Sequence, residues 1–338
     1  MTTTDLPQYT RKDFSSDQEV RWCPGCGDYA ILATLQKLLA DLGRAPHDTV
    51  FVSGIGCSSR FPYYMDTYGI HSIHGRAPAI ATGLSSSRPD LDVWVITGDG
   101  DALSIGGNHL IHALRRNVNV NILLFNNEIY GLTKGQYSPT SPRGSVHKST
   151  PMGSIDQPLN PVSLALGAEA TFVARTIDTD RAHLTEVLTA AHAHRGTSLV
   201  EIYQNCVVFN DDFSHAITDR DTKVINQIPL RQGEPIVFGP DGERAVVAEA
   251  DGSLRIVATA EAGDRVVIHD AGREEPTTAF ALSRLSHNPT GPTPLGIFRD
   301  VDRPVYDDML NDQVRQARDA RDADLQDLLE SGSVWDVD

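Results

Sequence analysis

Two short motifs place an acid and an amide at points where strands are expected to end. Gly98–Asp99–Gly100 follows one apolar run, and 25 residues later Asn126–Asn127 follows another. Because ligands of parallel sheets bind outside the carboxyl ends of strands, we expect Asp99 and Asn127 to lie on neighbouring strand ends. Their hard oxygen atoms suit Mg²⁺, which commonly binds through one or two protein groups together with phosphates. The glycines let the backbone approach a diphosphate closely, so the pair predicts a site for a metal-bound diphosphate.

Other glycine motifs explain this pattern less well. A dinucleotide fingerprint starting at Gly98 needs glycine at position 103, where Leu103 stands, and one starting at Gly54 needs glycine at position 59, where Ser59 stands. A Walker loop is also absent from the sequence. A tight turn without a ligand would explain Gly98–Asp99–Gly100 alone, but it leaves the paired asparagines unexplained.

Four cysteines form the second group of chemically interesting residues. Cys23 and Cys26 make a C-x-x-C pair, and Cys57 and Cys206 stand alone, each after an expected strand. Four thiolates are the number that closes a tetrahedral zinc site or holds a [4Fe–4S] cluster. Zinc is disfavoured because a second C-x-x-C or a His-x-x-x-His partner is missing, and a redox-active dithiol would not need the other two cysteines. Four unrelated buried thiols are the remaining alternative.

The apolar pattern predicts elements that can position these residues. Apolar positions at three- and four-residue steps predict a helix from Asp28 to about Gly43, and others follow through Leu103–Leu114 and Arg181–His194. Strands are expected at 49–52, 92–97, 120–125, 170–174 and 198–203. Strand, helix and strand within about forty residues make a βαβ unit. We therefore predict an α/β fold with a mostly parallel sheet flanked by helices, and a long ordered loop at 133–162.

Composition restricts the class of protein. Against 29 lysines and arginines stand 45 aspartates and glutamates, a formal charge of −16. This balance argues against nucleic-acid binding, which needs a basic surface. The sequence contains no apolar run long enough to span a membrane, and its first residues lack the features of a secretory signal. We therefore expect a cytoplasmic protein that binds neither membranes nor nucleic acids.

Changes in composition and in the hydrophobic pattern divide the chain into four expected parts. Residues 1–20 are polar and predict an arm over the surface, and residues 21–215 carry the candidate ligands. Residues 216–300 contain short apolar segments separated by glycine turns, which predicts a small β-rich extension. Residues 301–338 carry 11 acidic and 4 basic residues, which predicts a solvated acidic segment.

Together these motifs resemble a known family. The Gly-Asp-Gly and Asn-Asn pair resembles the signature of thiamin-diphosphate enzymes. Three surrounding segments resemble the β subunit of 2-oxoacid:ferredoxin oxidoreductases. These segments are Trp22–Cys23–Pro24–Gly25–Cys26–Gly27, Gly54–Ile55–Gly56–Cys57–Ser58–Ser59–Arg60 and Tyr130–Gly131–Leu132–Thr133–Lys134–Gly135–Gln136. The similarity covers residues 18–215 and continues at 292–299. It implies the thiamin-diphosphate-binding fold.

The resemblance also implies roles for individual residues. It places Mg²⁺ on Asp99, Asn127 and the backbone carbonyl of Ile129, against the diphosphate of thiamin diphosphate. It assigns all four cysteines to one [4Fe–4S] cluster. Further residues are expected beside the cofactor, with His74 also a candidate catalytic residue: His74, Gly98, Gly100, Asp101, Gly131 and Leu132.

The implied reaction converts a 2-oxoacid, coenzyme A and oxidised ferredoxin into an acyl-CoA, CO₂ and reduced ferredoxin. Arg60, a second candidate catalytic residue, offers a fixed cation for a distal carboxylate, and we expect it to contact substrate together with Leu132 and Lys134. These residues favour 2-oxoglutarate, with pyruvate or broad specificity as the alternative. Arg60 and Lys134 would have no such role if they merely pair with nearby acids.

The resemblance implies that the active site is shared with another chain. Thiamin enzymes use a glutamate from a pyrimidine-binding domain, which this sequence does not contain. We therefore expect an α (or fused γα) partner subunit to supply that group and much of the coenzyme A site, so that the chain alone is inactive. Two other hypotheses remain: a non-redox thiamin-diphosphate decarboxylase or synthase subunit, and a zinc-stabilised interaction protein without catalysis.

Overall fold

The computed structural model describes residues 8–286, 288–320, 324–335 and 337. Residues 1–7 of the expected N-terminal arm, and residues 321–323, 336 and 338 of the acidic segment, lie outside this range. The described part of the arm contains the short helix η1 (Arg11–Phe14), whose Phe14 is fully buried against α1 (Asp28–Asp41).

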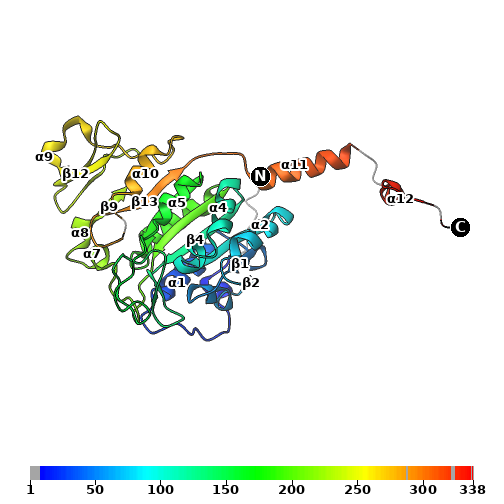
Figure 1. Cartoon of the computed structure of the whole chain (residues 1–338), viewed down its shortest axis with the longest axis horizontal. Coiled ribbons are helices and arrows are strands. Elements are labelled where there is room, and N and C mark those ends of the chain that lie inside the picture. The colour runs from blue at the N-terminus through cyan, green and yellow to red at the C-terminus, as the bar shows by residue number, and fades with distance from the viewer. Residues whose placement is uncertain (1–7, 287, 321–323, 336, 338) are drawn as a thin grey trace.

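The described chain is built around an eight-stranded sheet (Figure 1). All neighbouring strands are parallel except β7 and β13, which are antiparallel. This confirms the predicted mostly parallel α/β fold. The spatial order is β2 (Tyr68–His71), β1 (Thr49–Ser53), β3 (Asp92–Gly98), β4 (Val120–Asn126), β8 (Thr197–Tyr203), β7 (Phe172–Ile177), β13 (Thr293–Asp300) and β9 (Gln227–Leu230).

Helices cover both faces of the sheet. Successive side chains of a strand point to opposite faces, so Val50 and Val52 join one apolar cluster while Phe51 joins the other. The first cluster includes residues of α2 (Ala77–Ser87), α4 (Gly107–Arg116) and α5 (Pro161–Gly167), and the second includes residues of α1 and α6 (Arg181–Ala193). Burial on both faces explains why these strands are apolar along their whole length.

Helix α1 illustrates how the sequence sets an element. Its apolar positions are buried. The helix ends shortly before Gly43, whose φ of +67° is in the left-handed region. The N–H of Arg44 then bonds to the carbonyl of Leu39 at 3.0 Å, which satisfies an otherwise unpaired helix carbonyl. The sequence-based expectation for this helix is confirmed to within two residues at its end.

The carboxyl ends of the central strands carry most of the candidate residues. Strand β3 runs directly into α3 (Asp99–Leu103), and β4 is followed by the small hairpin of β5 (Ile129–Tyr130) and β6 (Gln136–Tyr137). Strand β1 leads to η3 (Ser58–Tyr64), which begins just after Cys57. The long loop predicted from 133–162 is present, apart from β6 and the start of α5.

The region after residue 215 has two roles in the fold. Strands β10 (Val237–Phe238), β11 (Arg244–Ala248) and β12 (Leu254–Ala258) form a small antiparallel sheet, within the region whose apolar pattern predicted a β-rich extension. However, β9 and β13 from the same region extend the main sheet. The remaining short elements are η2 (Pro46–Asp48), α7 (His215–Thr218), α8 (Lys223–Asn226), α9 (Thr259–Ala262), η4 (Gly263–Arg265) and α10 (Thr277–Ser283).

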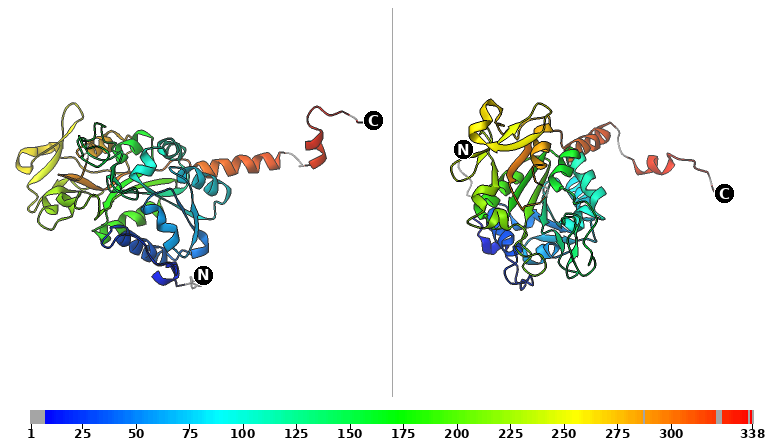
Figure 2. Two further views of the ribbon diagram at one scale, coloured as in Figure 1. Left: turned by 60° about the horizontal axis from the view of Figure 1, so that its bottom comes forward. Right: turned by 60° about the vertical axis from the view of Figure 1, so that its left-hand side comes forward.

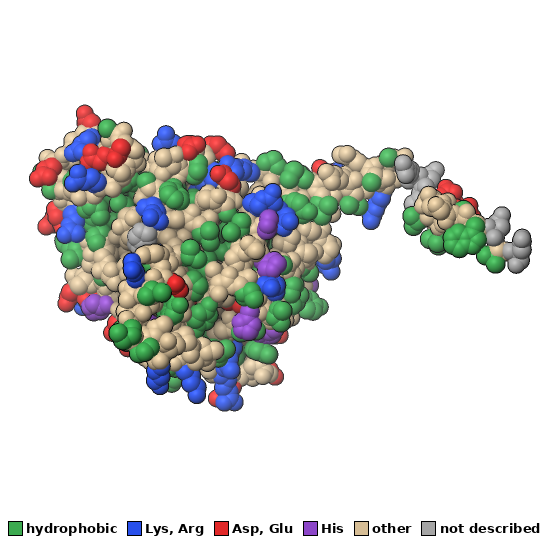
Figure 3. Space-filling view, viewed as in Figure 1, with side chains coloured by type: hydrophobic (Ala, Val, Ile, Leu, Met, Phe, Trp, Pro, Cys, Tyr) green, Lys and Arg blue, Asp and Glu red, His purple; other side chains and the backbone are tan. Residues whose placement is uncertain are grey.

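The acidic segment leaves the body of the molecule. Helix α11 (Tyr306–Asp319) is anchored at its first turn, where Asp307 accepts hydrogen bonds from Ser86 Oγ at 2.9 Å and Asn119 N at 2.6 Å. The rest of α11 projects outward, and α12 (Leu325–Glu330) lies beyond it (Figure 2). Apolar side chains on α12 are exposed (Figure 3), with Leu325, Leu328 and Leu329 each at least 65% exposed.

None of the helices in the described part of the chain combines the length and the apolar character that crossing a bilayer requires.

Candidate active site

A cavity of about 790 Å³ opens at the carboxyl ends of β1, β3 and β4. Apolar side chains such as Ile55, Ile105 and Phe125 form part of its wall. Most of the residues predicted from the sequence line it: Cys57, His74, Gly98, Asp99, Gly100, Asp101, Asn127, Ile129, Gly131 and Leu132. The structure therefore brings the acid, the amide and one candidate thiol to a single space, at the sheet edge that the sequence predicted.

Asp99 is held in place by the long loop. Its side chain is buried, and its Oδ2 accepts hydrogen bonds from Ser138 Oγ at 2.5 Å and from Thr140 Oγ1 at 2.6 Å. Burial raises the pKa of Asp99 to about 6, although the two hydroxyl groups oppose this shift. Both of these hydroxyl groups bond to Oδ2, and among the described residues no side-chain donor bonds to Oδ1.

Asn127 is fixed through both its side chain and its backbone. Its Nδ2 donates to Gln204 Oε1 at 2.8 Å, and its carbonyl oxygen accepts from Asn210 Nδ2 at 2.8 Å. The next residue, Glu128, has a φ of +55°, which turns the chain sharply between Asn127 and Ile129. Asn127 and the Asp99 carboxylate thus offer oxygen atoms of the kind that Mg²⁺ prefers.

Asp101 organises the cavity walls with its own carboxylate. Oδ1 accepts from Gly75 N at 2.8 Å and Ile55 N at 3.1 Å, and Oδ2 accepts from Thr97 Oγ1 at 2.8 Å. A side chain on Gly54 would meet this carboxylate at 1.8 Å, which explains the glycine there. Asp101 therefore joins the loops after β1 and β2 to the end of β3.

We predict that Asp101→Ala destabilises the chain by about 3 kcal/mol, because it leaves three donors in or beside the cavity wall without their acceptor. Asp101→Asn should cost much less, since its carbonyl can still accept from the two backbone N–H groups and its amide can donate to Thr97. Urea unfolding of the three proteins measures this difference. Equal stability of the alanine and asparagine variants would contradict the assigned hydrogen bonds.

The predicted histidine lies at the mouth of the cavity. His74 is exposed, and it belongs to the loop that Asp101 holds through Gly75. His71 lies apart from the cavity lining, where its Nδ1 bonds to Ser53 Oγ at 2.9 Å and its ring packs on Tyr63. The structure therefore places His74, and not His71, beside the candidate cofactor site.

The four cysteines are free and lie near one another at the side of this cavity. A Cβ atom on Gly131 would stand 3.5 Å from Cys206 Sγ and 3.8 Å from Cys57 Sγ, so these two sulfur atoms flank one point. Burial raises the pKa of Cys57 to about 11, and the nearby charges of Asp28, Cys206 and Cys23 add to the shift. For Cys26, burial and then the charge of Asp28 raise the pKa, with smaller contributions from Cys206 and Cys57.

The spacing of these thiols bears on what they can hold. In the part of the chain that is described, no three His, Cys, Asp or Glu side chains are close enough to bind one metal ion. A tetrahedral zinc ion would draw four sulfur atoms to about 4 Å from one another. The described cysteines are not gathered that closely.

Two predicted substrate residues lie outside the cavity lining. Arg60 is on η3, where its Nη1 donates to the carbonyl of Arg21 at 3.2 Å. It lines a separate surface hollow of about 380 Å³ with residues that include Glu19 and Tyr63. Lys134 is exposed, with a φ of +76°, and also lies outside the lining residues. The structure thus brings neither cation into the cavity in this chain.

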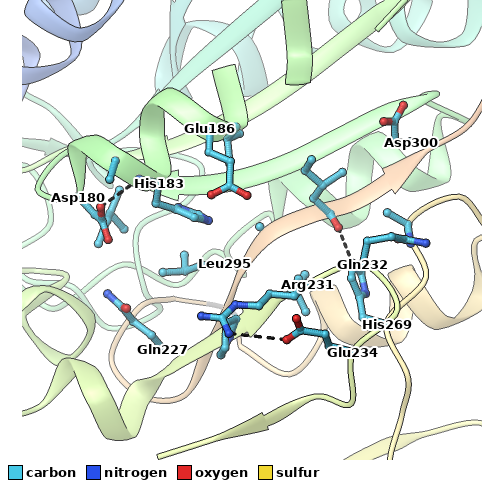
Figure 4. A pocket seen from close by; sticks show the side chains of 18 of the residues that line it. Asp180, His183, Glu186, Gln227, Arg231, Gln232, Glu234, His269, Leu295 and Asp300 are labelled. Atoms are coloured by element: carbon cyan, nitrogen blue, oxygen red, sulfur yellow. Dashed lines mark hydrogen bonds and ion pairs between the residues drawn. The ribbon is translucent and has the colours of Figure 1, made fainter. Parts of the chain in front are cut away.

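A second cavity of about 820 Å³ lies elsewhere, between α6, β13 and the segments that follow β9 and β12 (Figure 4). Its walls carry His183 and Glu186 from α6, facing Arg231 and Glu234. All the residues predicted as site residues are described, and none of them lines this cavity.

Several positioning residues escaped the sequence analysis. Ser138 and Thr140 belong to a loop rich in serine, threonine and proline, where nothing in the local pattern marks one hydroxyl above another. Gln204 directly precedes Asn205–Cys206, and only its nearness to a candidate ligand could have drawn attention to it.

Comparison with known proteins agrees with this geometry. A family model described as the C-terminal TPP binding domain of thiamine pyrophosphate enzymes matches residues 54–202. The 2-oxoglutarate oxidoreductase subunit KorB of Mycobacterium tuberculosis is 62% identical over 340 residues, which cover 99% of this chain and 90% of that protein. The 2-oxoacid:ferredoxin oxidoreductase β subunit of Saccharolobus solfataricus is 39% identical, over 73% of this chain and 79% of that protein.

A solved structure supports the same relationship. The 2-oxoglutarate:ferredoxin oxidoreductase from Magnetococcus marinus, with 2-oxoglutarate, coenzyme A and succinyl-CoA bound, superposes with a TM-score of 0.77. The aligned sequences are 32% identical, and the match covers 97% of each chain. This chain therefore belongs to the KorB family, the β subunits of 2-oxoacid:ferredoxin oxidoreductases.

Proposed function

We propose that this chain, together with an α (or fused γα) subunit, oxidises 2-oxoglutarate in the cytoplasm. In the reaction, 2-oxoglutarate and coenzyme A yield succinyl-CoA and CO₂, and the electron pair leaves through a [4Fe–4S] cluster to oxidised ferredoxin. The observation that carries the proposal is the single cavity lined by both Asp99 and Asn127, with four cysteines at its side. A reducing compartment keeps these thiols available as ligands.

The cofactor site uses this chain's oxygen atoms. Asp99 Oδ1, the Asn127 side-chain oxygen and the Ile129 carbonyl would hold Mg²⁺ on the diphosphate of thiamin diphosphate. Gly98 lines this site together with Ser58. When bound, thiamin diphosphate supplies the carbanion chemistry of 2-oxoacid decarboxylation. The protein binds it, orients it and keeps apolar side chains around its reactive part.

The cluster site is proposed on Cys23, Cys26, Cys57 and Cys206. Cys57 and Gly131 both line the cofactor cavity, and a Cβ atom on Gly131 would be within 4 Å of the sulfur atoms of Cys57 and Cys206. Electrons from a substrate in the cavity would thus travel only a short distance to the cluster. Cys23 is the exposed member of the four, on the side from which an acceptor such as ferredoxin can approach.

The partner subunit is proposed to cover the cavity mouth. Apolar side chains stand exposed around it, with Ile73 at 68%, Ile105 at 58% and Leu132 at 50% exposure. Such residues are typical of surfaces that a partner buries. The partner would supply the glutamate that activates thiamin and much of the coenzyme A site. In this arrangement His74 and Leu132 face substrate, while Arg60 and Lys134 reach it only if the assembled enzyme reorganises their segments.

The decisive experiment purifies the chain with its partner subunit under anaerobic conditions. We expect viologen reduction that requires both 2-oxoglutarate and coenzyme A, and is much slower with pyruvate. The chain alone should be inactive. CO₂ release without coenzyme A or an electron acceptor would instead identify a non-redox decarboxylase, and a colourless protein with stoichiometric zinc would contradict the redox function.

We further predict that Cys57→Ser or Cys206→Ser removes most of the visible iron–sulfur absorption of the complex and lowers viologen reduction about 100-fold or more, a loss typical of removing a group that acts only in catalysis. Thiamin-diphosphate binding should persist, because the oxygen ligands are intact. Ser59→Ala, a change at a buried hydroxyl beside Cys57, serves as the control. Full activity in either cysteine variant would argue against the cluster.

A further inference from the structure

Gln204 lies between the two proposed sites. It directly follows β8, and its side chain is buried, with 1% exposure. One end of its amide contacts Asn127 and the other contacts Cys26. No other side chain in the described hydrogen-bond network bonds to both a candidate metal ligand and a candidate cluster ligand.

The surroundings determine which way this amide points. Its Nε2 lies 2.6 Å from the carbonyl oxygen of Asn205 and 3.2 Å from Cys26 Sγ. A backbone carbonyl can only accept, so the atom facing Asn205 must be the nitrogen. Consequently Oε1 faces the other way, toward Asn127. The hydrogen bonds select this orientation, because the flipped amide would set two acceptors against each other.

That orientation in turn fixes Asn127. Because Gln204 presents an oxygen, the atom of Asn127 that faces it must be Nδ2, which donates at 2.8 Å. The Asn127 Oδ1 is then directed away from Gln204, and it also accepts from Ile129 N at 3.2 Å. The loop that carries Gln204 holds Asn127 a second time, since Asn210 Nδ2 donates to the Asn127 carbonyl. Gln204, together with the Ile129 N–H group, therefore orients Asn127 so that it presents oxygen, and not nitrogen, to a cation.

The other end of the amide acts on sulfur. An N–H group aimed at a ligand thiolate stabilises negative charge on that sulfur, and hydrogen bonds to sulfur are among the factors that set the potential of an iron–sulfur cluster. The reduced cluster carries one more negative charge than the oxidised cluster. A donor at Cys26 Sγ therefore favours reduction, which helps the cluster accept electrons from the neighbouring cavity.

We propose that Gln204 is a positioning residue shared by both sites: its carbonyl orients Asn127 toward the metal, and its N–H group raises the reduction potential of the cluster at Cys26. The inference rests on the proposed function, because it needs the metal-bound diphosphate and the cluster. Gln204 is not among the residues that line the cavity, so it acts through Asn127 and Cys26.

The test compares Gln204→Glu and Gln204→Met in the complex with the partner subunit. Glutamate keeps one oxygen toward Asn127, but its other oxygen replaces the N–H group and brings negative charge beside the Asn205 carbonyl and Cys26 Sγ. It should lower the cluster potential in a redox titration followed by electron paramagnetic resonance, with Mg²⁺-dependent thiamin-diphosphate affinity near that of the wild type. Methionine has nearly the same shape but no amide. It should lower the potential by less and weaken thiamin-diphosphate binding about tenfold or more in calorimetric titrations.

Gln36→Glu is the matched control, because Gln36 is a buried glutamine on α1 whose Nε2 bonds to the backbone carbonyl of Tyr64 at 3.1 Å. It should leave both the potential and the binding unchanged. Wild-type potentials in both Gln204 variants would overturn the action on sulfur, and wild-type binding in Gln204→Met would overturn the orientation of Asn127. A wild-type complex without an iron–sulfur signal would instead refute the proposed cluster, and the action on sulfur with it.

Discussion

Replacing Asp99 with asparagine is expected to weaken Mg²⁺-dependent binding of thiamin diphosphate to the assembled enzyme by about 100-fold or more. The substitution removes the negative charge that faces the cation. The hydroxyl groups of Ser138 and Thr140 would continue to occupy one side of the residue. Calorimetric titration at fixed Mg²⁺ concentration measures the loss.

The same substitution should not lower the stability of the ligand-free chain. Burial raises the pKa of Asp99 from its ordinary value of 3.8 to about 6, so the ionised carboxylate disfavours folding at neutral pH. This unfavourable contribution to the free energy of folding grows as the pH rises from 3.8 to about 6, and it is absent below pH 3.8. Asp99→Asn should therefore be at least as stable as the wild type at pH 7, and any advantage should vanish in acid.

Asp92→Asn provides the control, because Asp92 lies at the opposite end of the same strand, near Arg44 and His192. It should leave binding unchanged. If Asp99→Asn bound thiamin diphosphate as tightly as the wild type, Asp99 would not be the metal ligand.

The largest loss of stability is expected from Arg175→Met. The Arg175 Nε atom donates to Glu201 Oε2 at 2.7 Å, and both side chains are essentially inaccessible. The guanidinium also lies over the rings of Tyr203 and Phe298, at 5.4 Å from each centroid. Removing the cation leaves the Glu201 charge buried and unpaired, which costs about 3–5 kcal/mol. Urea unfolding of the purified chain tests this value.

Two further variants separate the charge from the packing. Arg303→Met removes a more exposed arginine that pairs with Glu169 and Glu274, and it should cost about 1 kcal/mol or less. Combining Arg175→Met with Glu201→Gln should recover much of the lost stability, because the amide carries no charge and can still accept from Asn126, as Glu201 Oε1 does at 2.7 Å. A double variant no more stable than Arg175→Met would mean that packing around the guanidinium, and not the charge, dominates.

The parts of the fold that were predictable are those set by local pattern. Buried parallel strands are apolar throughout, so β3 and β4 were visible in the sequence, and Asp99 and Asn127 follow them directly. Parallel strands bring their carboxyl ends to one edge, which is why the pairing of these two residues could be inferred without knowing the order of the strands.

What escaped prediction depends on contacts between distant segments. Strand β2 has only four residues, none of them buried, so it lacks the pattern of a strand. Strand β13 joins the sheet antiparallel to β7, from more than a hundred residues away, and its apolar run does not reveal its partner. Likewise, the hydroxyl groups that bind Asp99 come from a loop whose course no local signal sets.

Helix α11 is anchored at one end only, so a rotation at the anchored end moves the free end much farther. Its 14 residues span about 21 Å, with the fixed point at the first turn around Asp307. A rotation of a few degrees at this point displaces the far end of the helix several times more than it displaces the residues at the sheet surface. The exposed leucines of α12 therefore lie well outside the volume of the sheet (Figure 2), and their distance from it depends on the stiffness of α11.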